Sequence, residues 1–256
     1  MSSLRGRSPQ NLPIIVVRTG DPVPTVAATR GAFADLIAQA ASIEPSGADG
    51  GANGSPLPFE VFDIRVEAPP DPRAAAAFII TGSAANVPSR EPWMLSAEAW
   101  LRDVVRAGTP TLGICFGHQI LAQALGGDVQ KNPRGREIGT VRIERIADDP
   151  LFDGLPASFE VNATHIDTVA VRPPGATSLA RSSLDDHQAI RFTEACYGVQ
   201  FHPEIDADVM RAYLEARREI LASERFVVDT LLAEATNAPH GRQILRNFLR
   251  TIASSG

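Results

Sequence analysis

Residues 111–125 constrain the fold most, because an apolar strand runs directly into a cysteine and then into an apolar helix. Thr111–Ile114 reads as a short buried strand, Cys115 follows it, and Gly117 permits a tight turn before a helix expected over 118–125. This is the strand-turn-helix pattern of a nucleophile elbow, which projects one side chain at the carboxyl end of a sheet. A thiol there lies near a helix N-terminus, whose dipole and free N–H groups favour the thiolate and can stabilise an oxyanion.

A second motif lies far downstream, where an apolar run ends in a histidine followed by a carboxylate. The run 196–200 reads as a strand, and His202 and Glu204 stand just after it. With Cys115 they form a candidate nucleophile, base and orienting acid, the parts of a hydrolytic triad. A lone cysteine between apolar residues is usually structural. Two such residues that each follow a strand favour a reactive site, because open α/β sheets bind ligands at the carboxyl ends of their strands.

The remaining pattern predicts an α/β protein with an open, mostly parallel sheet and helices on both faces. A β-rich excursion separates the two motifs, and helices follow the second. Strands are expected over 12–17, 59–64, 76–80, 111–114, 137–146, 159–162, 168–171, 178–180, 188–192 and 196–200. Helices are expected over 29–41, 92–107, 118–125, 207–223, 226–235 and 241–252.

The domain organisation is predicted from composition. Residues 1–11 are polar and are expected to form a flexible tail, whereas 12–256 are expected to form a single domain on which the C-terminal helices of 207–252 pack. The segment 46–58 is rich in glycine and reads as a flexible loop at the sheet edge opposite the carboxyl ends of the strands. A chain of 256 residues with 44% hydrophobic content can bury one large core.

Charge and cysteine content argue against several classes of protein. The formal net charge is −6 and there is no basic tract, which argues against nucleic-acid binding. Two cysteines suggest no disulfide framework, and Cys196 reads as inert core. No stretch approaches the roughly 20 apolar residues that span a membrane, so no membrane partner and a cytoplasmic location are expected. His187 stands beside two aspartates but lacks the spacing of metal ligands, so no metal site is expected.

The two motifs resemble those of class I (triad) glutamine amidotransferases. Gly-Ile-Cys-Phe-Gly-His-Gln at 113–119 and Val-Gln-Phe-His-Pro-Glu at 199–204 occur in the order that the family has, and the resemblance covers about residues 14–204. Further similar segments are 79–83, 126–127, 132–133, 137–139, 165–169 and 188–190. They are similar to stand-alone members like the amidotransferase half of GMP synthetase. Ile166 departs from GMP synthetase proper, where glycine is expected, and is closer to the subgroup that includes γ-glutamyl peptidases.

The resemblance implies a flavodoxin-like fold and a C–N hydrolase that works through a Cys-His-Glu triad. In the family's chemistry, Cys115 would attack the γ-carbonyl of a glutamyl group, His202 would move the proton, and Glu204 would hold His202 in place. The backbone N–H groups of Gly82 and Phe116 would face the oxyanion. No cofactor is implied.

Three further residues are candidate substrate contacts: Gln119, His165 and Asp167. Packing at the helix end is an equal alternative for Gln119, and shaping of a loop is the alternative for the other two. His118 lies about one helical turn after the cysteine, but no carboxylate stands beside it in sequence, so it is not the expected base.

The leading hypothesis is a hydrolase that converts glutamine to glutamate and ammonia through a γ-glutamyl thioester. The sequence has no G-x-x-x-x-G-K-[ST] motif, so the chain is not expected to activate an acceptor with ATP, and a separate synthetase subunit would receive the ammonia. The nearest alternative is a γ-glutamyl peptidase that acts on γ-glutamyl amides or peptides. The second alternative is a non-catalytic regulatory protein on the same fold. A pocket open beyond the γ-nitrogen would favour the peptidase.

Overall fold

The computed structural model describes residues 12–42 and 59–254. Its strands are β1 Ile14–Arg18, β2 Phe59–Asp63, β3 Ala77–Ile80, β4 Thr111–Ile114, β5 Asp128–Lys131, β6 Glu137–Arg145, β7 Ser158–His165, β8 Asp167–Val171, β9 Thr177–Arg181, β10 Ala189–Thr193 and β11 Cys196–Val199. Its helices are α1 Pro24–Arg30, α2 Phe33–Ser42, α3 Pro92–Ala107, α4 Phe116–Ala124, α5 Ala207–Ala216, α6 Arg218–Ser223, α7 Val228–Glu234 and α8 Pro239–Ser254. Two short 3₁₀ helices, η2 Val87–Ser89 and η3 Pro150–Phe152, complete the described elements.

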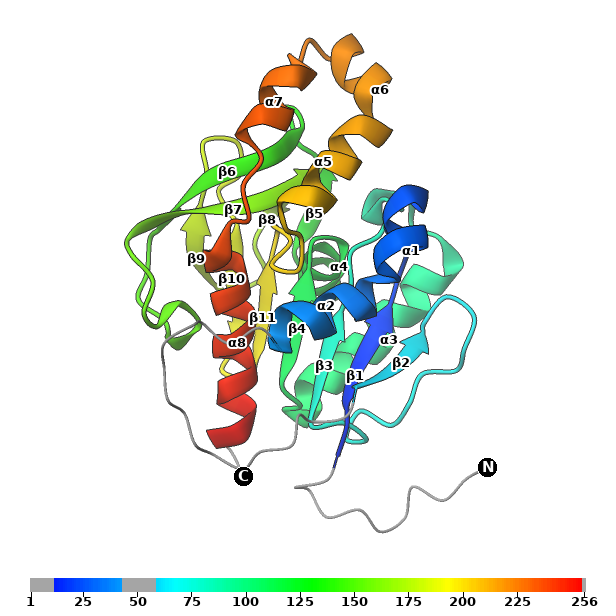
Figure 1. Cartoon of the computed structure of the whole chain (residues 1–256). Helices are drawn as coiled ribbons and strands as arrows, with labels where there is room; N and C mark the ends of the chain where they lie inside the picture. Colours follow the sequence, from blue (N-terminus) through cyan, green and yellow to red (C-terminus); the bar gives the residue numbers. More distant parts are fainter. Residues whose placement is uncertain (1–11, 43–58, 255–256) are drawn as a thin grey trace.

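The main sheet has nine strands in the order β2-β1-β3-β4-β11-β10-β9-β6-β7, and β5 pairs with β8 in a separate two-stranded sheet (Figure 1). Strands β2, β1, β3, β4 and β11 are parallel to one another. Strands β10, β9, β6 and β7 continue the sheet in antiparallel fashion. The predicted open α/β sheet is confirmed. Of the β-rich excursion, β6, β7, β9 and β10 form the antiparallel part of that sheet, whereas β5 and β8 pair separately.

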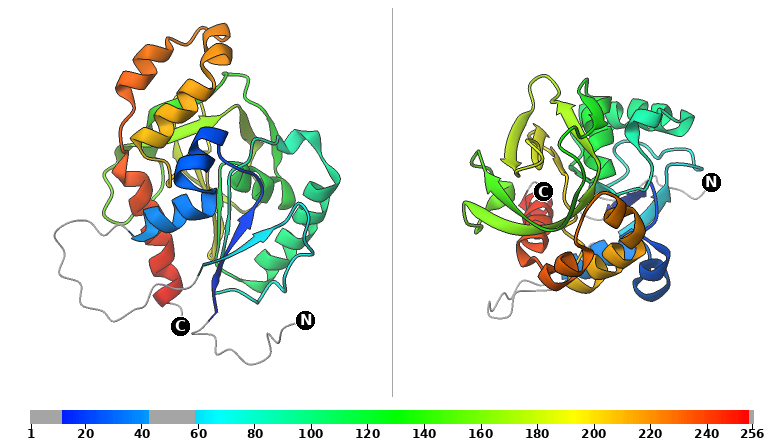
Figure 2. Two further views of the ribbon diagram at one scale, coloured as in Figure 1. Left: turned by 45° about the vertical axis from the view of Figure 1, so that its right-hand side comes forward. Right: turned by 90° about the horizontal axis from the view of Figure 1, so that it is seen from above.

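Alternate residues of the parallel strands supply two separate cores, because successive side chains of a strand point to opposite faces. Ile14 and Val16 of β1 belong to the core under α2 and α8, whereas Ile15 and Val17 belong to the core under α3 and α4. The two helix pairs therefore cover opposite faces of the sheet (Figure 2).

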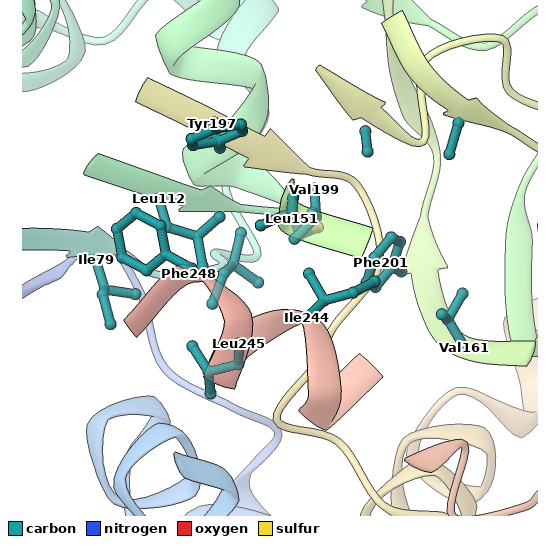
Figure 3. Packing of buried hydrophobic residues seen from close by; sticks show 14 of the residues in the cluster. Ile79, Leu112, Leu151, Val161, Tyr197, Val199, Phe201, Ile244, Leu245 and Phe248 are labelled. Carbon is teal, nitrogen blue, oxygen red and sulfur yellow. The ribbon is translucent and has the colours of Figure 1, made fainter. Parts of the chain in front are cut away.

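Helix α8 is held by its apolar face. Ile244, Leu245 and Phe248 are all fully buried and face Leu112 of β4 and Val199 of β11 (Figure 3). Burying each of these side chains stabilises the fold by about 1.5–3 kcal/mol. The C-terminal helix is therefore part of the core beneath the strands that carry the two sequence motifs.

Several expected boundaries were wrong for local reasons. The helix expected over 29–41 is two helices, since Gly31 has a left-handed backbone with φ of 84° and ends α1. The helix expected over 207–223 divides at Arg217, where φ is −114°. Strand β5 was not expected, because only one of its four residues is buried and the strand pattern is weak. The expectations for 1–11 and 46–58 lie outside the described residues.

Two differences bear on the site described next. Helix α4 begins at Phe116 rather than at 118, so the cysteine stands directly at its N-terminus. Strand β7 extends beyond the expected 159–162 and ends at His165. In the part of the chain that the structure describes, none of the helices combines the length and apolar character that crossing a membrane requires.

Candidate active site

Cys115 stands at the junction of β4 and α4, at the carboxyl edge of the sheet. Its backbone has φ of 51° and ψ of −102°, a conformation that residues with a Cβ rarely adopt and that stores strain. The Cys115 N–H donates to the carbonyl oxygen of Val199 at 2.8 Å, and its carbonyl oxygen accepts from the N–H of Gln119 at 3.1 Å. The strained residue is thus tied to β11 on one side and to α4 on the other.

The tight turn needs glycine because α4 lies close to the sheet. A Cβ on Gly117 would lie 2.4 Å from the carbonyl oxygen of Ile80 in β3, and a Cβ on Gly113 would lie 2.4 Å from the carbonyl oxygen of Gly117. Both distances are far below van der Waals contact, so a side chain at either position would push the helix away from the sheet. The glycines therefore fix the direction in which the thiol points.

The structure brings His202 and Glu204 to the same edge. Strand β11 lies parallel to β4 with Val199 opposite Ile114, so the residues that follow both strands are neighbours. His202 Nδ1 lies 2.7 Å from Glu204 Oε1, and His202 is close enough to Cys115 for its charge to lower the pKa of the thiol. The thiol itself lies 4.0 Å from the carbonyl oxygen of Thr164. Because a carboxylate only accepts, Nδ1 carries a proton and Nε2 is the nitrogen left to face the thiol.

The imidazole of His202 is confined on further sides. The ring of Phe33 in α2 stacks on it with centroids 5.9 Å apart and an interplanar angle of 21°. A Cβ on Gly82 would lie only 2.7 Å from His202 Cε1. His202 and Glu204 are both 3% exposed. The imidazole of His202 is therefore held in one position by the residues around it.

The charges of the site favour a thiolate and an imidazolium. Burial by itself raises the pKa of the Cys115 thiol, but the charge and hydrogen bond of His202 outweigh burial and hold this pKa below its ordinary value. Burial by itself lowers the pKa of His202, but Glu204 and Cys115 together raise it to about 10. In contrast, burial alone raises the pKa of Cys196, so of the two thiols only Cys115 has a pKa below its ordinary value.

Three backbone N–H groups lie on segments that border the elbow. Phe116 is the first residue of α4, so its N–H has no partner within the helix. The Gly82 carbonyl oxygen accepts hydrogen bonds from the hydroxyls of Thr19 and Thr81, each at 3.1 Å. Because the peptide is planar and trans, the N–H of Ser83 points away from these hydroxyls. Among the described residues, the N–H groups of Gly82, Ser83 and Phe116 donate to no other group.

Two hollows meet at the thiol. One has a volume of about 360 Å³ and includes Gln119, so it is called the Gln119 hollow. The other has a volume of about 190 Å³ and includes His202, so it is called the His202 hollow. Both are lined by Ser83, Ala84, Cys115, Thr164 and Arg217. A larger hollow of about 590 Å³ follows β6 and does not reach the cysteine.

Gln119 lines the Gln119 hollow, but both hydrogens of its side-chain amide donate to other groups of the protein. Its Nε2 donates to the carbonyl oxygen of Asp167 and to Gln200 Oε1, both at 3.0 Å. The side chain is 4% exposed. The helix-end packing considered from sequence is thus present, and a substrate contact remains for Oε1.

His165 and Asp167 also reach the Gln119 hollow, joined to a buried polar network. His165 Nδ1 lies 3.0 Å from the carbonyl oxygen of Asp167, and its Nε2 lies 2.9 Å from Glu137 Oε2. Burial opposes protonation of His165, but the hydrogen bond with Glu137 and the charge of Asp185 raise its pKa above the ordinary value. A charge on His165 in turn helps to lower the pKa of the Cys115 thiol.

The remaining histidine near the elbow has a different environment. His118 is fully buried, its ring centroid lies 6.0 Å from that of Phe192, and burial lowers its pKa to about 3. It is a neutral core residue. Among the described residues, no group of three or more His, Cys, Asp or Glu side chains is placed to hold a metal ion.

Several residues that line the site were not predicted from the sequence, among them Ser83, Thr164, Tyr213 and Arg217. Ser83 belongs to the segment 79–83, which resembles the family, and the glycine-serine pair after a buried strand could have marked it as a site residue. The other three stand outside any motif, and only the packing of β7 and α5 around the elbow brings them to the thiol.

The model of the glutamine amidotransferase class-I family matches residues 73–218, which is more than half of the chain. The chain belongs to the class I glutamine amidotransferase family. The predicted membership is confirmed, and the curated relatives of this amidotransferase are glutamine-hydrolysing enzymes by name.

Sequence relatives of this amidotransferase are GMP synthases. The GMP synthase of Thermomicrobium roseum is 42% identical over 127 residues, which are 50% of this chain and 23% of that protein. The glutamine-hydrolysing GMP synthase subunit of Pyrococcus furiosus is 38% identical over 131 residues, which are 49% of this chain and 69% of its own length. The match therefore spans about a quarter of the Thermomicrobium protein and about two thirds of the Pyrococcus protein.

Solved structures confirm the fold of this amidotransferase over nearly its whole length. A glutamine amidotransferase from Methylobacillus flagellatus has a TM-score of 0.70 at 24% identity and covers 94% of each chain. A glutamine amidotransferase from Thermotoga maritima has a TM-score of 0.66 at 22% identity and covers 94% of this chain and 97% of its own. The expected flavodoxin-like α/β fold is thus confirmed.

Proposed function

We propose that this amidotransferase hydrolyses the γ-amide of a glutamyl group and releases glutamate, with Cys115, His202 and Glu204 as its catalytic triad. The observation that supports this most is that His202 is held between Glu204 and the thiol in a buried, prealigned arrangement. The Cys115 thiolate attacks the γ-carbonyl carbon, and a C–S bond forms. His202 gives its proton to the leaving nitrogen, and the C–N bond breaks. A water then loses a proton to His202, attacks the thioester and restores the thiolate.

The oxyanion of each tetrahedral intermediate lies near the N-terminus of α4. We assign the Phe116 N–H as one donor and the backbone at Gly82 and Ser83 as the source of the other. The two hydroxyls on the Gly82 carbonyl hold this peptide in one orientation. A donor that is fixed in the isolated chain supports turnover without a partner protein.

Glutamine is the first candidate substrate, with ammonia as the leaving group. The Pyrococcus relative is named as a subunit of GMP synthase. Delivery of the ammonia to a separate synthetase subunit is therefore the partner hypothesis, and Gln119, His165 and Asp167 are the candidate contacts for the glutamyl group in the Gln119 hollow.

A γ-glutamyl peptidase is the second candidate, and one observation favours it. The His202 hollow continues past the thiol on the side of the base, where the leaving nitrogen must receive its proton. Its volume of about 190 Å³ is about six times the roughly 30 Å³ that one water occupies in the liquid, so it admits more than ammonia.

Glutamate release by the purified protein tests both candidates. Glutamine and a panel of γ-glutamyl dipeptides are compared with and without ATP, and Cys115→Ala serves as the inactive control. Release from glutamine supports the first candidate, and release from dipeptides alone supports the second. Absence of release from every substrate, together with no labelling of Cys115 by an electrophilic glutamine analogue, would refute the hydrolase and leave the regulatory alternative.

A further inference from the structure

Arg217 lies where the two hollows meet, at the break between α5 and α6. Its guanidinium carbon lies 4.9 Å from the ring centroid of Tyr213, and its Nη1 donates to Thr164 Oγ1 at 2.5 Å. The stacked ring and the threonine hydroxyl fix the plane of the guanidinium. Only one of its five N–H donors has a hydrogen-bond acceptor in the described part of the chain.

Arg217 differs from the arginines around it because no described carboxylate pairs with it. Arg136, which also lines the Gln119 hollow, makes a bidentate pair with Glu224. The adjacent Arg218 pairs with Glu215 and Asp229. A partly buried cation without a carboxylate partner is costly, and burial accordingly lowers the pKa of Arg217. The Cys115 thiolate acts on the guanidinium, but its charge is lost when the thioester forms. The guanidinium thus lacks a carboxylate partner in the described part of the chain and can bind one that a substrate brings.

The side on which this anion lies follows from the lining of the hollows. Tyr213, which holds the guanidinium, lines the His202 hollow and not the Gln119 hollow. His202, which must protonate the leaving nitrogen, also lines only the His202 hollow. Asp21 stands in this hollow too, but it is paired with Arg18 at 2.5 Å and Arg65 at 3.5 Å, so its charge is compensated.

We propose that Arg217 binds a carboxylate on the leaving group, so that the preferred substrates are γ-glutamyl amino acids with a free carboxylate. This inference rests on the proposed γ-glutamyl hydrolysis. The planar guanidinium matches the geometry of a carboxylate and can bind it with two parallel hydrogen bonds. Pro22, Val23 and Pro24 line the rest of the hollow, which suits a leaving amino acid with a small apolar side chain.

The reaction keeps the chemistry of the triad. The Cδ–N bond breaks while the Cδ–Sγ bond is in place, the proton of His202 passes to the nitrogen, and a free amino acid leaves with its carboxylate on Arg217. Water then cleaves the thioester and releases glutamate, so one water is consumed for each γ-glutamyl bond.

A matched pair of substrates isolates the carboxylate. γ-Glutamylglycine and γ-glutamylglycinamide differ only in whether the leaving group ends in a carboxylate or in a neutral amide. Since a hydrogen bond to a charged group is the stronger kind, the wild-type protein should favour the acid by roughly 10- to 100-fold in kcat/KM. In Arg217→Gln this ratio should fall towards one. Arg217→Lys should keep part of the preference for the acid, because the positive charge remains but the two parallel hydrogen bonds of the guanidinium are lost.

The control variant is Arg218→Gln, whose arginine is the sequence neighbour and pairs only with surface carboxylates. It should leave the acid-to-amide ratio unchanged. A wild-type ratio near one would overturn the proposal without any variant. An equal loss of kcat/KM for the acid and for the amide in Arg217→Gln would also overturn the proposal. It would mean that the guanidinium contacts the glutamyl group, which both substrates share. If glutamate is released from glutamine and from the neutral amide while the acid is not preferred, only the role of Arg217 fails. If neither dipeptide nor glutamine is cleaved, the hydrolase itself fails.

Discussion

Replacing Glu204 with glutamine keeps the size of the side chain and removes its charge, so this change isolates what the carboxylate does for His202. In the wild-type protein, Glu204 Oε1 lies 2.7 Å from Nδ1, and the pKa of His202 is raised to about 10. The reactive form needs Cys115 as thiolate and His202 as imidazolium. Activity should therefore persist at neutral pH and decline as His202 loses its proton near pH 10.

The size of the effect follows from the hydrogen bond. A bond to a charged group contributes about 1.5–3 kcal/mol and a neutral one about 0.5–1.5 kcal/mol, and a pKa change of one corresponds to 1.36 kcal/mol. The loss of the carboxylate charge disfavours the imidazolium, so the alkaline limit should move down by roughly one pH unit. Glu204 Oε2 is buried without a hydrogen-bond partner in the described part of the chain. An amide nitrogen there adds an unpaired donor that costs about 1–3 kcal/mol of stability.

The assay is kcat/KM for glutamate release from neutral to strongly alkaline pH, with thermal melting to confirm folding. The matched control is Glu98→Gln, a 5% exposed carboxylate of α3 that pairs with Arg90 away from the site. This control should lose stability without any change in the alkaline limit. An alkaline limit that stays near pH 10 in Glu204→Gln, or one that moves equally in the control, would refute the reasoning.

Further expected outcomes concern the thiol and its surroundings. A glutamine analogue with an electrophilic γ-carbon should label Cys115 and spare Cys196 in mass spectrometry, because only the first thiol has a lowered pKa; earlier labelling of Cys196 would contradict this. Gly82→Ala places a Cβ 2.7 Å from Cε1 of His202 and should lower kcat/KM by roughly 10²-fold, and a loss of less than tenfold would count against a confined imidazole. His202→Ala should lower kcat/KM by roughly 10²–10⁴-fold, whereas His118→Ala should chiefly lower the melting temperature. A larger loss of kcat/KM in His118→Ala than in His202→Ala would identify His118 as the base instead. ATP should leave glutamate release unchanged.

The elbow and the histidine motif could be predicted from sequence because their signals are local. A buried strand, a reactive residue and a glycine determine the elbow within a few positions, as Gly113 and Gly117 show. Glu204 follows His202 by two residues, so their contact also depends on local geometry. The parallel half of the sheet was predictable for the same reason, since its strands are short continuous apolar runs.

The rest of the site depends on contacts that sequence does not display. Glu137 lies opposite His165 because of the register of β6 and β7, and a register cannot be read from either strand alone. Arg217 stands at a helix break that has neither glycine nor proline, so the pattern of 207–223 read as one continuous helix. The direction of its side chain depends on Tyr213 and Thr164, which come from different elements.

The pairing of β4 with β11 has a consequence for how the chain folds. Gln119 and Gln200 are joined by a hydrogen bond at 3.0 Å although 81 residues separate them, and all of β5 to β10 lies between them in sequence. Closing a chain segment of that length costs about 4 kcal/mol in entropy, and non-local pairings of this kind slow folding. We therefore expect Cys115 and His202 to meet late, after the intervening strands have formed. During refolding from denaturant, the recovery of activity should lag behind the burial of tryptophan in the N-terminal half, so activity reports the completed fold.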